Sequence, residues 1–217
     1  MEDSVHHKQL RHELVETVRR KGISDEKVLK ALEEVPRHLF VNETIPLNEA
    51  YEDKPLEIGS GQTISQPFTV AYQSHLLDVH PSDKILEVGT GSGYQAAILL
   101  LLGANVHSIE RQENLYHRTK QKLSELGYSQ VQTYYGDGNE GLKNEAPFDK
   151  IIVTAASPGI PPKLVKQLKI GGYLVIPVNG NIQKMMRITR ISETETSTES
   201  FDAFQFVPLL RGVNSAR

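Results

Sequence analysis

A glycine-rich segment between a predicted strand and a predicted helix is the part of the sequence best suited to binding a ligand. It covers residues 86–94, reads LEVGTGSGY, and contains Gly89, Gly91 and Gly93. Glycine permits the tight turn and the close approach of backbone to ligand that such a junction needs, and the helix N-terminus adds oriented N–H groups. The segment therefore predicts a site for a nucleoside-containing cofactor, although a glycine-rich turn can also serve only to reverse the chain.

Two acidic residues narrow the choice of cofactor. Glu110 ends the next predicted strand, roughly 20 residues further on, where an acid can bind the hydroxyls of a ribose. Glu87 lies just before the first glycine, where a carboxylate would repel a pyrophosphate but would suit a cationic amino-acid end. The spacing G-x-G-x-G also departs from the G-x-G-x-x-G of dinucleotide sites. These features favour S-adenosylmethionine as the cofactor. The alternative is a nicotinamide cofactor, with which the chain would be an oxidoreductase.

Two later turns are predicted to face the same cleft, because ligands of open α/β sheets bind at the carboxyl ends of the strands. The first is the turn Gly136-Asp137-Gly138, where Asp137 could accept a hydrogen bond from an adenine amino group. An ordinary Asp-Gly turn is the alternative. The second is the run of small residues 154–157, which leaves room for a ligand or serves close packing.

A polar segment before the predicted sheet is a candidate substrate site. Residues 55–67 read PLEIGSGQTISQP, which is too polar for a core element and ends at the start of a predicted helix. Hydroxyl groups at a helix N-terminus form an anion site, so Thr63 and Ser65 could hold a substrate carboxylate. The alternative is that Ser65 only caps the helix that begins at Pro67.

The periodicity of apolar residues predicts an α/β fold with a mostly parallel, doubly wound sheet. Strands are expected at 85–88, 105–109, 131–135, 150–153 and 173–177, alternating with helices at 94–102, 112–126 and 162–168. Helices are also expected at about 10–18, 25–36 and 67–77, with an extended loop over 37–61. Two last strands, 184–191 and 201–207, form a predicted antiparallel hairpin with a solvated tip at 192–200.

Composition excludes several classes of function. The 217 residues carry a formal net charge of −3, which gives no basic footprint for nucleic acid. The absence of cysteine excludes disulfides and thiolate chemistry, and the eight histidines form no metal or catalytic-triad pattern, so no metal is expected. We expect no signal peptide and no membrane span, since the apolar runs are far shorter than the ~20 residues needed. A cytoplasmic location is the resulting expectation.

Several segments together resemble one family, the protein-L-isoaspartate O-methyltransferases. They are residues 35–37, 55–67, 86–94, 148–156 and 206–209, so the likeness covers nearly the whole chain. Many methyltransferases share the glycine-rich segment. The stretch Gln62–Pro67, QTISQP, is far more specific and carries the resemblance.

The resemblance implies a single Rossmann-like class I methyltransferase domain over residues 1–217. N-terminal helices and the active-site loop would occupy 1–80, the cofactor-binding core 81–180, and the hairpin and tail 181–217. It also implies that the last two strands exchange places relative to most methyltransferases, which spacing alone does not show.

The resemblance further implies the roles of individual residues. Ser65 would be the active-site serine, and S-adenosyl-L-methionine the cofactor, leaving as S-adenosyl-L-homocysteine. The implied cofactor contacts are Ile64, Ser65, Gln66, Pro67, Glu87, Gly89, Gly91, Gly93, Glu110, Arg111, Asp137 and Gly138. The implied substrate contacts are Thr63, Ser65, Val207, Pro208 and Leu209, the last three closing over the site. Ser60 receives no role.

The implied reaction is methylation of the free α-carboxylate of L-isoaspartyl residues in damaged proteins and peptides, which initiates repair through a succinimide. A carboxylate with a pKa near ~4 is already ionised at neutral pH, so no strong base is needed and Ser65 would position the carboxylate. We expect neither a nucleic-acid nor a membrane partner, and a monomer. The alternatives are a methyltransferase for a small molecule or RNA, and an interaction module that has lost catalysis.

Overall fold

The computed structural model describes residues 3–215, and its N-terminal part is helical as expected. α1 (Val5–Arg20) begins at Ser4, whose hydroxyl accepts from the backbone N–H of His7, and α2 (Glu26–Glu34) begins at Asp25. Asp25 Oδ1 accepts from two backbone N–H groups of the first turn of α2, at 3.0 and 3.3 Å. The sequence left Ser24 and Asp25 open as the cap of α2, and the structure selects Asp25.

The prediction of an extended loop over 37–61 was wrong in part. This region contains a 3-10 helix, η1 (Arg37–Phe40), a short helix, α3 (Leu47–Ala50), and the first strand, β1 (Leu56–Gly59). β1 pairs antiparallel with β2 (Gln62–Ile64). Leu56 and Ile58 are buried while their neighbours are exposed, which is the alternation of a strand packed on one face. An alternation over only four residues is too short to be recognised in a sequence rich in glycine and proline.

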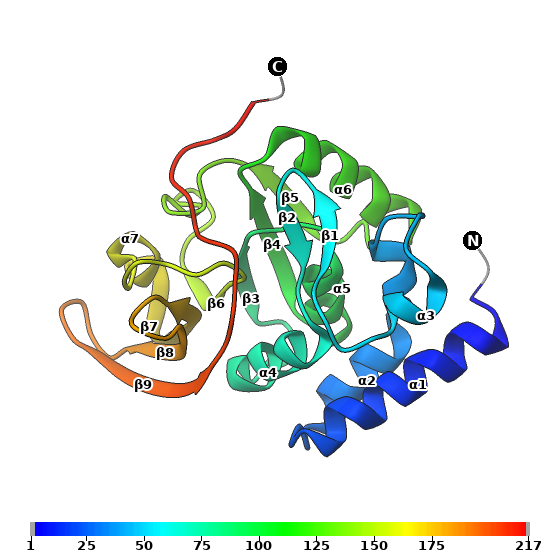
Figure 1. Cartoon of the computed structure of the whole chain (residues 1–217). Helices are drawn as coiled ribbons and strands as arrows, with labels where there is room; N and C mark the ends of the chain where they lie inside the picture. Colours follow the sequence, from blue (N-terminus) through cyan, green and yellow to red (C-terminus); the bar gives the residue numbers. More distant parts are fainter. Residues whose placement is uncertain (1–2, 216–217) are drawn as a thin grey trace.

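A seven-stranded sheet forms the centre of the molecule, in the order β5-β4-β3-β6-β7-β8-β9 (Figure 1). The strands are β3 (Lys84–Val88), β4 (Asn105–Glu110), β5 (Gln132–Tyr135), β6 (Phe148–Val153), β7 (Leu168–Val178), β8 (Lys184–Arg190) and β9 (Thr196–Ala203). β3 to β7 are parallel, and β8 and β9 form the antiparallel hairpin. β8 lies inside and β9 at the edge, so the last strands follow chain order across the sheet.

Both faces of the sheet are covered, as a doubly wound fold requires. The remaining helices are α4 (Pro67–Leu77), α5 (Tyr94–Leu101), α6 (Glu113–Glu125) and α7 (Pro162–Val165). Neighbouring residues of one strand fall into different buried clusters: Ile85 and Ile152 belong to one cluster, Leu86 and Ile151 to the other. Since successive side chains of a strand point to opposite faces, the clusters are the two layers of core. The first contains residues of α1, α2, α4, α5 and α6, and the second includes Leu164 of α7.

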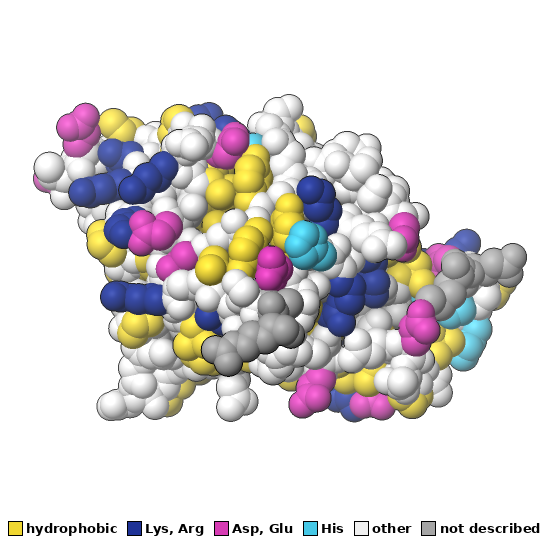
Figure 2. Space-filling model, turned by 90° about the horizontal axis from the view of Figure 1, so that it is seen from above, with side chains coloured by type: hydrophobic (Ala, Val, Ile, Leu, Met, Phe, Trp, Pro, Cys, Tyr) yellow, Lys and Arg dark blue, Asp and Glu magenta, His cyan; other side chains and the backbone are white. Residues whose placement is uncertain are grey.

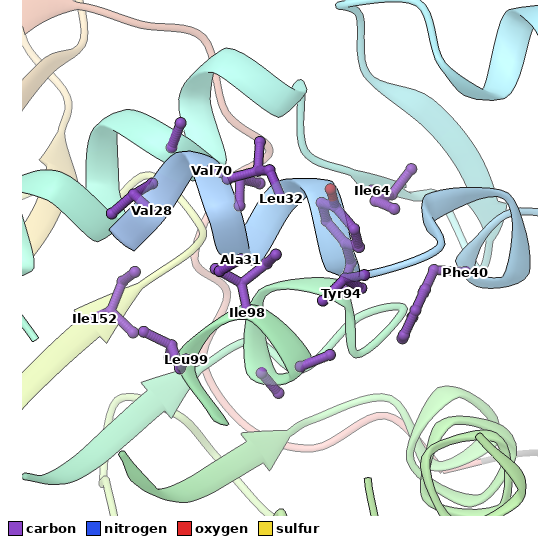
Figure 3. Close-up of a cluster of buried hydrophobic side chains, with 14 of the residues drawn as sticks. Val28, Ala31, Leu32, Phe40, Ile64, Val70, Tyr94, Ile98, Leu99 and Ile152 are labelled. Carbon is purple, nitrogen blue, oxygen red and sulfur yellow. The ribbon is translucent and has the colours of Figure 1, made fainter. Parts of the chain in front are cut away.

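The N-terminal helices complete the larger layer of core. Figure 3 shows Val28, Ala31 and Leu32 of α2 close to Ile98 and Leu99 of α5, and all five are buried. α2 also contacts α4. The glycine-rich segment leads into α5, and the QTISQP segment leads into α4. By packing on both helices, α2 holds the two predicted site segments in a fixed relation.

The C-terminal hairpin differs from its predicted bounds. β9 begins at Thr196 inside the polar run that was predicted to be a solvated tip, and it ends at Ala203, so the predicted strand 201–207 was mostly wrong. The true tip is 191–195. Threonine favours strands, and an edge strand can be polar on both faces because water covers it. Arg187 of β8 also pairs with Glu199 of β9, at 2.8 and 3.0 Å.

The bounds of β7 and α7 also differ slightly from the prediction. β7 begins at Leu168, five residues before the predicted strand, and α7 ends at Val165. Among residues 3–215, no helix is both long enough and apolar enough to cross a membrane.

Arg37 is a fully buried cation that joins η1 to the following segment. Its Nε and Nη2 donate to the backbone carbonyls of Ala50 (3.1 Å) and Lys54 (3.2 Å), and its guanidinium lies 5.0 Å from the centre of the Tyr94 ring. Burial lowers the pKa of Arg37 to about 10, which leaves it charged at neutral pH. Arg37 therefore connects the N-terminal region to the first residue of α5.

We expect Arg37→Leu to lower the free energy of unfolding by about 2–4 kcal/mol, because two buried carbonyls lose their donor. Urea unfolding followed by circular dichroism measures this. Arg20→Leu, at an exposed position of α1, is the control and should change stability by less than about 0.5 kcal/mol. Equal stability of the two variants would contradict a structural role for Arg37.

Candidate active site

A cavity lies at the carboxyl ends of β3, β4 and β6, where a sheet of this type is expected to bind ligands. Its volume is about 740 Å³ including the space open to solvent, which is in the range of sites for small molecules. Predicted residues that line it are Thr63, Ile64, Ser65, Glu87, Gly89, Gly91, Glu110, Arg111, Gly138, Val207, Pro208 and Leu209. Residues more than 140 positions apart in sequence are thus brought together.

Four predicted site residues do not line this cavity. Gln66 lines a neighbouring cavity instead, while Pro67, Gly93 and Asp137 are outside both. Gly93 has φ 87°, and a Cβ there would come within 2.9 Å of Thr119 on α6, so it serves packing. The cofactor roles expected of these four residues stay predictions.

The glycine-rich segment has the backbone that its sequence predicts. Gly89 and Gly91 have φ of 98° and 51°, in the left-handed region that glycine adopts without cost. A Cβ at Gly89 would lie 2.5 Å from Thr154 Oγ1, so no other residue fits between the ends of β3 and β6. Thr154 Oγ1 donates to the carbonyl of Gly89 at 2.8 Å. The backbone on this side of the cavity is therefore fixed before any ligand binds.

Glu110 is held at the end of β4 by two backbone N–H groups. Its Oε2 accepts from Gly91 at 2.9 Å and its Oε1 from Gln112 at 2.8 Å. Each carboxylate oxygen has two lone pairs, so both keep acceptor capacity toward the cavity that Glu110 lines. This geometry can accept the hydroxyls of a ribose, the role that the sequence predicts.

Glu87 is a fully buried carboxyl group with one oxygen unsatisfied. The Ser108 hydroxyl donates to Oε2, and Thr90 Oγ1 lies 2.6 Å from Ser108 Oγ. Oε1 has no hydrogen-bond partner among the described residues. Burial raises the pKa of Glu87 to about 8; the hydrogen bond from Ser108 lowers it, and the nearby charge of Glu110 raises it. A cation in the cavity would supply the missing partner and favour the ionised form.

Ser65 does not cap the helix that follows it. The N-cap of α4 is Gln66, which makes no side-chain capping bond. Asp53 takes this role from a distant position, since its Oδ1 accepts from Phe68 N–H at 2.8 Å and its Oδ2 from Gln66 Nε2 at 3.0 Å. The half-buried Ser65 lines the cavity, so the capping alternative for this residue is wrong.

A second cavity adjoins the first. Four residues line both cavities: Thr63, Ser65, Thr154 and Val207. The second cavity contains three aromatic residues, Phe68, Phe204 and Phe206, and none of its lining residues is charged. Ser65 therefore lies at the junction of a polar cavity and an uncharged one.

The segment after β9 covers the first cavity. Val207 accepts from the backbone N–H of Ala156 at 2.8 Å, and Leu209 donates to the carbonyl of Ala156 at 2.7 Å. In Figure 1 this segment, drawn in red, passes in front of the sheet toward the C-terminus. Seen from above in Figure 2, apolar side chains gather near the middle of the molecule, with charged side chains of both signs around them.

Asp137 is engaged by its own chain. Its Oδ1 accepts from Asn139 N–H at 2.8 Å and its Oδ2 from Gly212 N–H at 2.7 Å. Arg111 Nε donates to the carbonyl of Gly212 at 2.9 Å. Asp137 therefore anchors the C-terminal tail beside the cavity, a role that no local sequence pattern indicates.

Sequence reasoning missed Asp53 and Gln95. Asp53 lies in the run YEDKP, which has no periodicity to mark it, and its partners at α4 are 13 and 15 residues away. Gln95 lines the first cavity and had a signal, since it is the only polar residue after Tyr94 in the otherwise apolar α5.

Comparison with known proteins places these features in a family. The sequence model of the protein-L-isoaspartate(D-aspartate) O-methyltransferases matches residues 8–214. The chain belongs to this family. It is 52% identical over 214 residues to the protein-L-isoaspartate O-methyltransferase of Christiangramia forsetii, covering 99% of this chain and 100% of that one. The enzyme of Flavobacterium johnsoniae is 50% identical, with the same coverage.

Solved structures agree on the fold. A protein-L-isoaspartate O-methyltransferase superposes with a TM-score of 0.84 at 27% identity, covering 91% of this chain and 65% of that chain. The Plasmodium falciparum beta-aspartate methyltransferase in complex with S-adenosyl-L-homocysteine gives a TM-score of 0.80 at 24% identity, with coverage of 92% and 98%. The predicted fold class, a Rossmann-like class I methyltransferase with a C-terminal antiparallel hairpin, is confirmed.

Family membership identifies S-adenosyl-L-methionine as the cofactor and contradicts the oxidoreductase alternative. The residues present fit this group. The unsatisfied Glu87 Oε1 suits the cationic amino-acid end, and the backbone at Gly89, where a Cβ would be blocked, suits close approach of a ligand.

We expect the stability of the ligand-free protein to depend on the protonation of Glu87. The pKa of about 8 exceeds the 4.5 of an unperturbed glutamate. Below pH 4.5 the protonated Glu87 makes its full contribution to the free energy of unfolding. This contribution declines as pH rises above 4.5 and is lost as pH passes through 8. Glu87→Gln should gain stability over the native chain across this window, by about 3–5 kcal/mol at its upper end.

Urea unfolding at a series of pH values measures this difference. Glu57→Gln, which removes an exposed carboxylate from β1, is the control for the loss of one negative charge. A constant difference between Glu87→Gln and the native chain from pH 4.5 to 8 would refute the assignment.

Proposed function

We propose that this chain transfers a methyl group from S-adenosyl-L-methionine to the free α-carboxylate of L-isoaspartyl residues in damaged proteins and peptides. The observation that carries the proposal is the position of Ser65, which lines both the cofactor cavity and the uncharged cavity beside it. Relatives of about 50% identity that carry the name protein-L-isoaspartate O-methyltransferase, aligned over almost all of this chain, support it.

The reaction needs alignment more than acid–base chemistry. The bound cofactor supplies a methyl group on a positively charged sulfur. The attacking carboxylate is already ionised at neutral pH, so the chain does not have to remove a proton. Ser65 would donate a hydrogen bond to the carboxylate and fix its direction of attack. Holding two reactants in line is worth roughly 7–11 kcal/mol in favourable cases.

The uncharged lining of the second cavity would assist by removing water from the carboxylate. Phe68, Phe204 and Phe206 offer no charge to pair with it, so its polar partners there would be neutral groups such as the hydroxyls of Ser65 and Thr63. A less solvated carboxylate is a stronger nucleophile. The reactive groups of this site are therefore few and neutral.

The product ester completes the repair without further help from the chain. Methoxide leaves an ester carbonyl far more readily than oxide leaves a carboxylate. The neighbouring backbone nitrogen can therefore attack the ester carbon, expel methanol and form a succinimide. Hydrolysis of the succinimide restores some normal aspartate. Damaged proteins are the partners in this proposal, with a monomer working in the cytoplasm and with neither nucleic acid nor membrane involved.

We expect Ser65→Ala to lower kcat/KM for an isoaspartyl peptide by about 10- to 100-fold, because the loss of one positioning hydrogen bond costs about 1.5–3 kcal/mol. Affinity for S-adenosyl-L-homocysteine by calorimetry should stay within about twofold. The assay follows labelled methyl transfer and base-labile ester, with the matching aspartyl peptide as the negative control.

Equal turnover of both peptides by the native chain would refute isoaspartyl specificity and favour a broader carboxyl methyltransferase. Unchanged turnover in Ser65→Ala would refute the role of Ser65 alone.

We also expect the second cavity to select residues that flank the isoaspartyl group. Placing a charged side chain in an uncharged cavity costs desolvation energy, so peptides with phenylalanine beside the damaged residue should be better substrates than peptides with glutamate. Phe204 contacts Tyr72 (ring centroids 4.8 Å) and Phe68 (6.2 Å), and Phe204→Ala should reduce this preference several-fold.

Phe201→Ala is the matched control for this experiment. Phe201 is a half-buried aromatic residue of β9 that packs near Arg187 and does not line the cavity. Ratios of kcat/KM for peptides with phenylalanine or glutamate on either side of the isoaspartyl group give the result. A preference that Phe204→Ala leaves unchanged, or that Phe201→Ala reduces equally, would exclude this cavity as the selective element.

A further inference from the structure

Gln95 is a buried polar residue whose amide oxygen has nothing to bind within the described chain. The residue is 6% exposed, and its Oε1 has no hydrogen-bond partner among residues 3–215. Leaving a buried acceptor unsatisfied costs free energy, so the atom needs an explanation. Gln95 lines the cofactor cavity, and a ligand there could supply the missing donor.

The other end of the same amide is fixed. Gln95 Nε2 donates to Ser74 Oγ at 2.9 Å, and Ser74 is fully buried on α4. This bond holds the amide group beside α4 at almost no exposure to water. The free oxygen is therefore a preorganised acceptor and not the flexible end of a surface side chain.

The position of Gln95 indicates which part of the cofactor it meets. Glu110 ends β4 and Arg111 follows it, on the side expected to bind the ribose. Gln95 is instead tied to α4, the helix that begins two residues after Ser65. Val70 of α4 and Ser65, beside which methyl transfer is proposed to occur, line the same cavity as Gln95.

Among residues 3–215, three residues that line the cavity have a buried side-chain oxygen without a partner: Glu87, Tyr94 and Gln95. The Tyr94 oxygen belongs to a hydroxyl, which carries its own proton, so Glu87 Oε1 and Gln95 Oε1 are the carboxyl and amide acceptors of this set. An amide oxygen can only accept, so it suits a group that carries protons. The cofactor's amino-acid end carries both an ammonium group and a carboxylate, and only the ammonium group can donate. Its three N–H bonds can serve more than one acceptor.

We infer that Gln95 Oε1, together with Glu87, binds the ammonium group of the cofactor's methionine end, and that Ser74 orients Gln95 for this contact. The inference rests on the proposed function only for the identity of the cofactor. It adds a neutral acceptor from α5 to the predicted set of cofactor contacts. It also links cofactor binding to α4, the helix that Ser65 precedes.

The test compares two ligands that differ at the amino-acid end. S-adenosyl-L-homocysteine carries the ammonium group, whereas 5′-methylthioadenosine has the adenine, ribose and sulfur but no amino-acid end. Gln95→Met, which is close to glutamine in shape, should weaken binding of S-adenosyl-L-homocysteine at least tenfold in calorimetry, as for loss of a hydrogen bond to a charged group. Its affinity for 5′-methylthioadenosine should stay within about twofold.

Gln73→Met is the matched control. Gln73 is a fully buried glutamine on α4 whose Oε1 also lacks a partner in the described part of the chain, but it does not line the cavity. Its Nε2 donates to the carbonyl of Val153 at 2.9 Å. Gln73→Met should leave the ratio of the two affinities unchanged, which separates ligand contact from a general effect on packing.

If Gln95→Met does not fold, Ser74→Ala replaces it, since this variant keeps Gln95 but removes the hydroxyl that orients its amide. The ratio of affinities should then fall several-fold. Equal loss for both ligands, no loss for either, or the same change in Gln73→Met would overturn the inference. Methyl transfer by the native chain is measured separately, so failure on isoaspartyl peptides would refute the proposed substrate and leave this result intact.

Discussion

The burial of the Glu87 carboxyl group at the end of β3 is the constraint on which the site depends. Its only hydrogen bond among the described residues comes from Ser108, its other oxygen has no partner there, and Glu87 lines the first cavity. A protein selected only for stability would place an apolar residue there. We interpret the carboxyl group as one member of an ion pair whose cation is part of the cofactor. Burying it lowers the stability of the ligand-free fold and makes cofactor binding specific.

The reaction centre is assembled by contacts that act on the backbone and leave the reactive side chains free. Asp53 caps α4 from outside the helix, so Ser65 does not have to. Glu110 binds Gly91, and Thr154 binds the carbonyl of Gly89, so the cofactor side of the cavity is rigid. Positioning of this kind is what a reaction between a bound electrophile and an ionised carboxylate requires, because no proton transfer precedes it.

The sequence predicts those parts of the fold that depend on local patterns. The parallel core follows from strand and helix periods, and Glu87, Gly89 and Glu110 follow from the chemistry of one βα junction. The hairpin of β1 and β2, and the early start of β9 at Thr196, depend on pairing with distant strands, so tertiary contacts override weak local signals. The roles of Asp53 and Asp137 likewise come from partners far along the chain, Asp137 binding Gly212, 75 residues away.

Selectivity for isoaspartate has to come from shape, since reactivity cannot supply it. The side-chain carboxylate of a normal aspartate has a pKa of about 3.9 and is equally ionised at neutral pH. The two carboxylates differ in reach: that of isoaspartate is attached directly to a main-chain carbon, while that of aspartate stands one methylene further out. Ser65 lies where two cavities meet, with Val207 lining both. If the main chain itself has to enter this junction, the carboxylate of isoaspartate reaches the position in line with the methyl group. The carboxylate of aspartate, one methylene further from the main chain, has its oxygens away from that line.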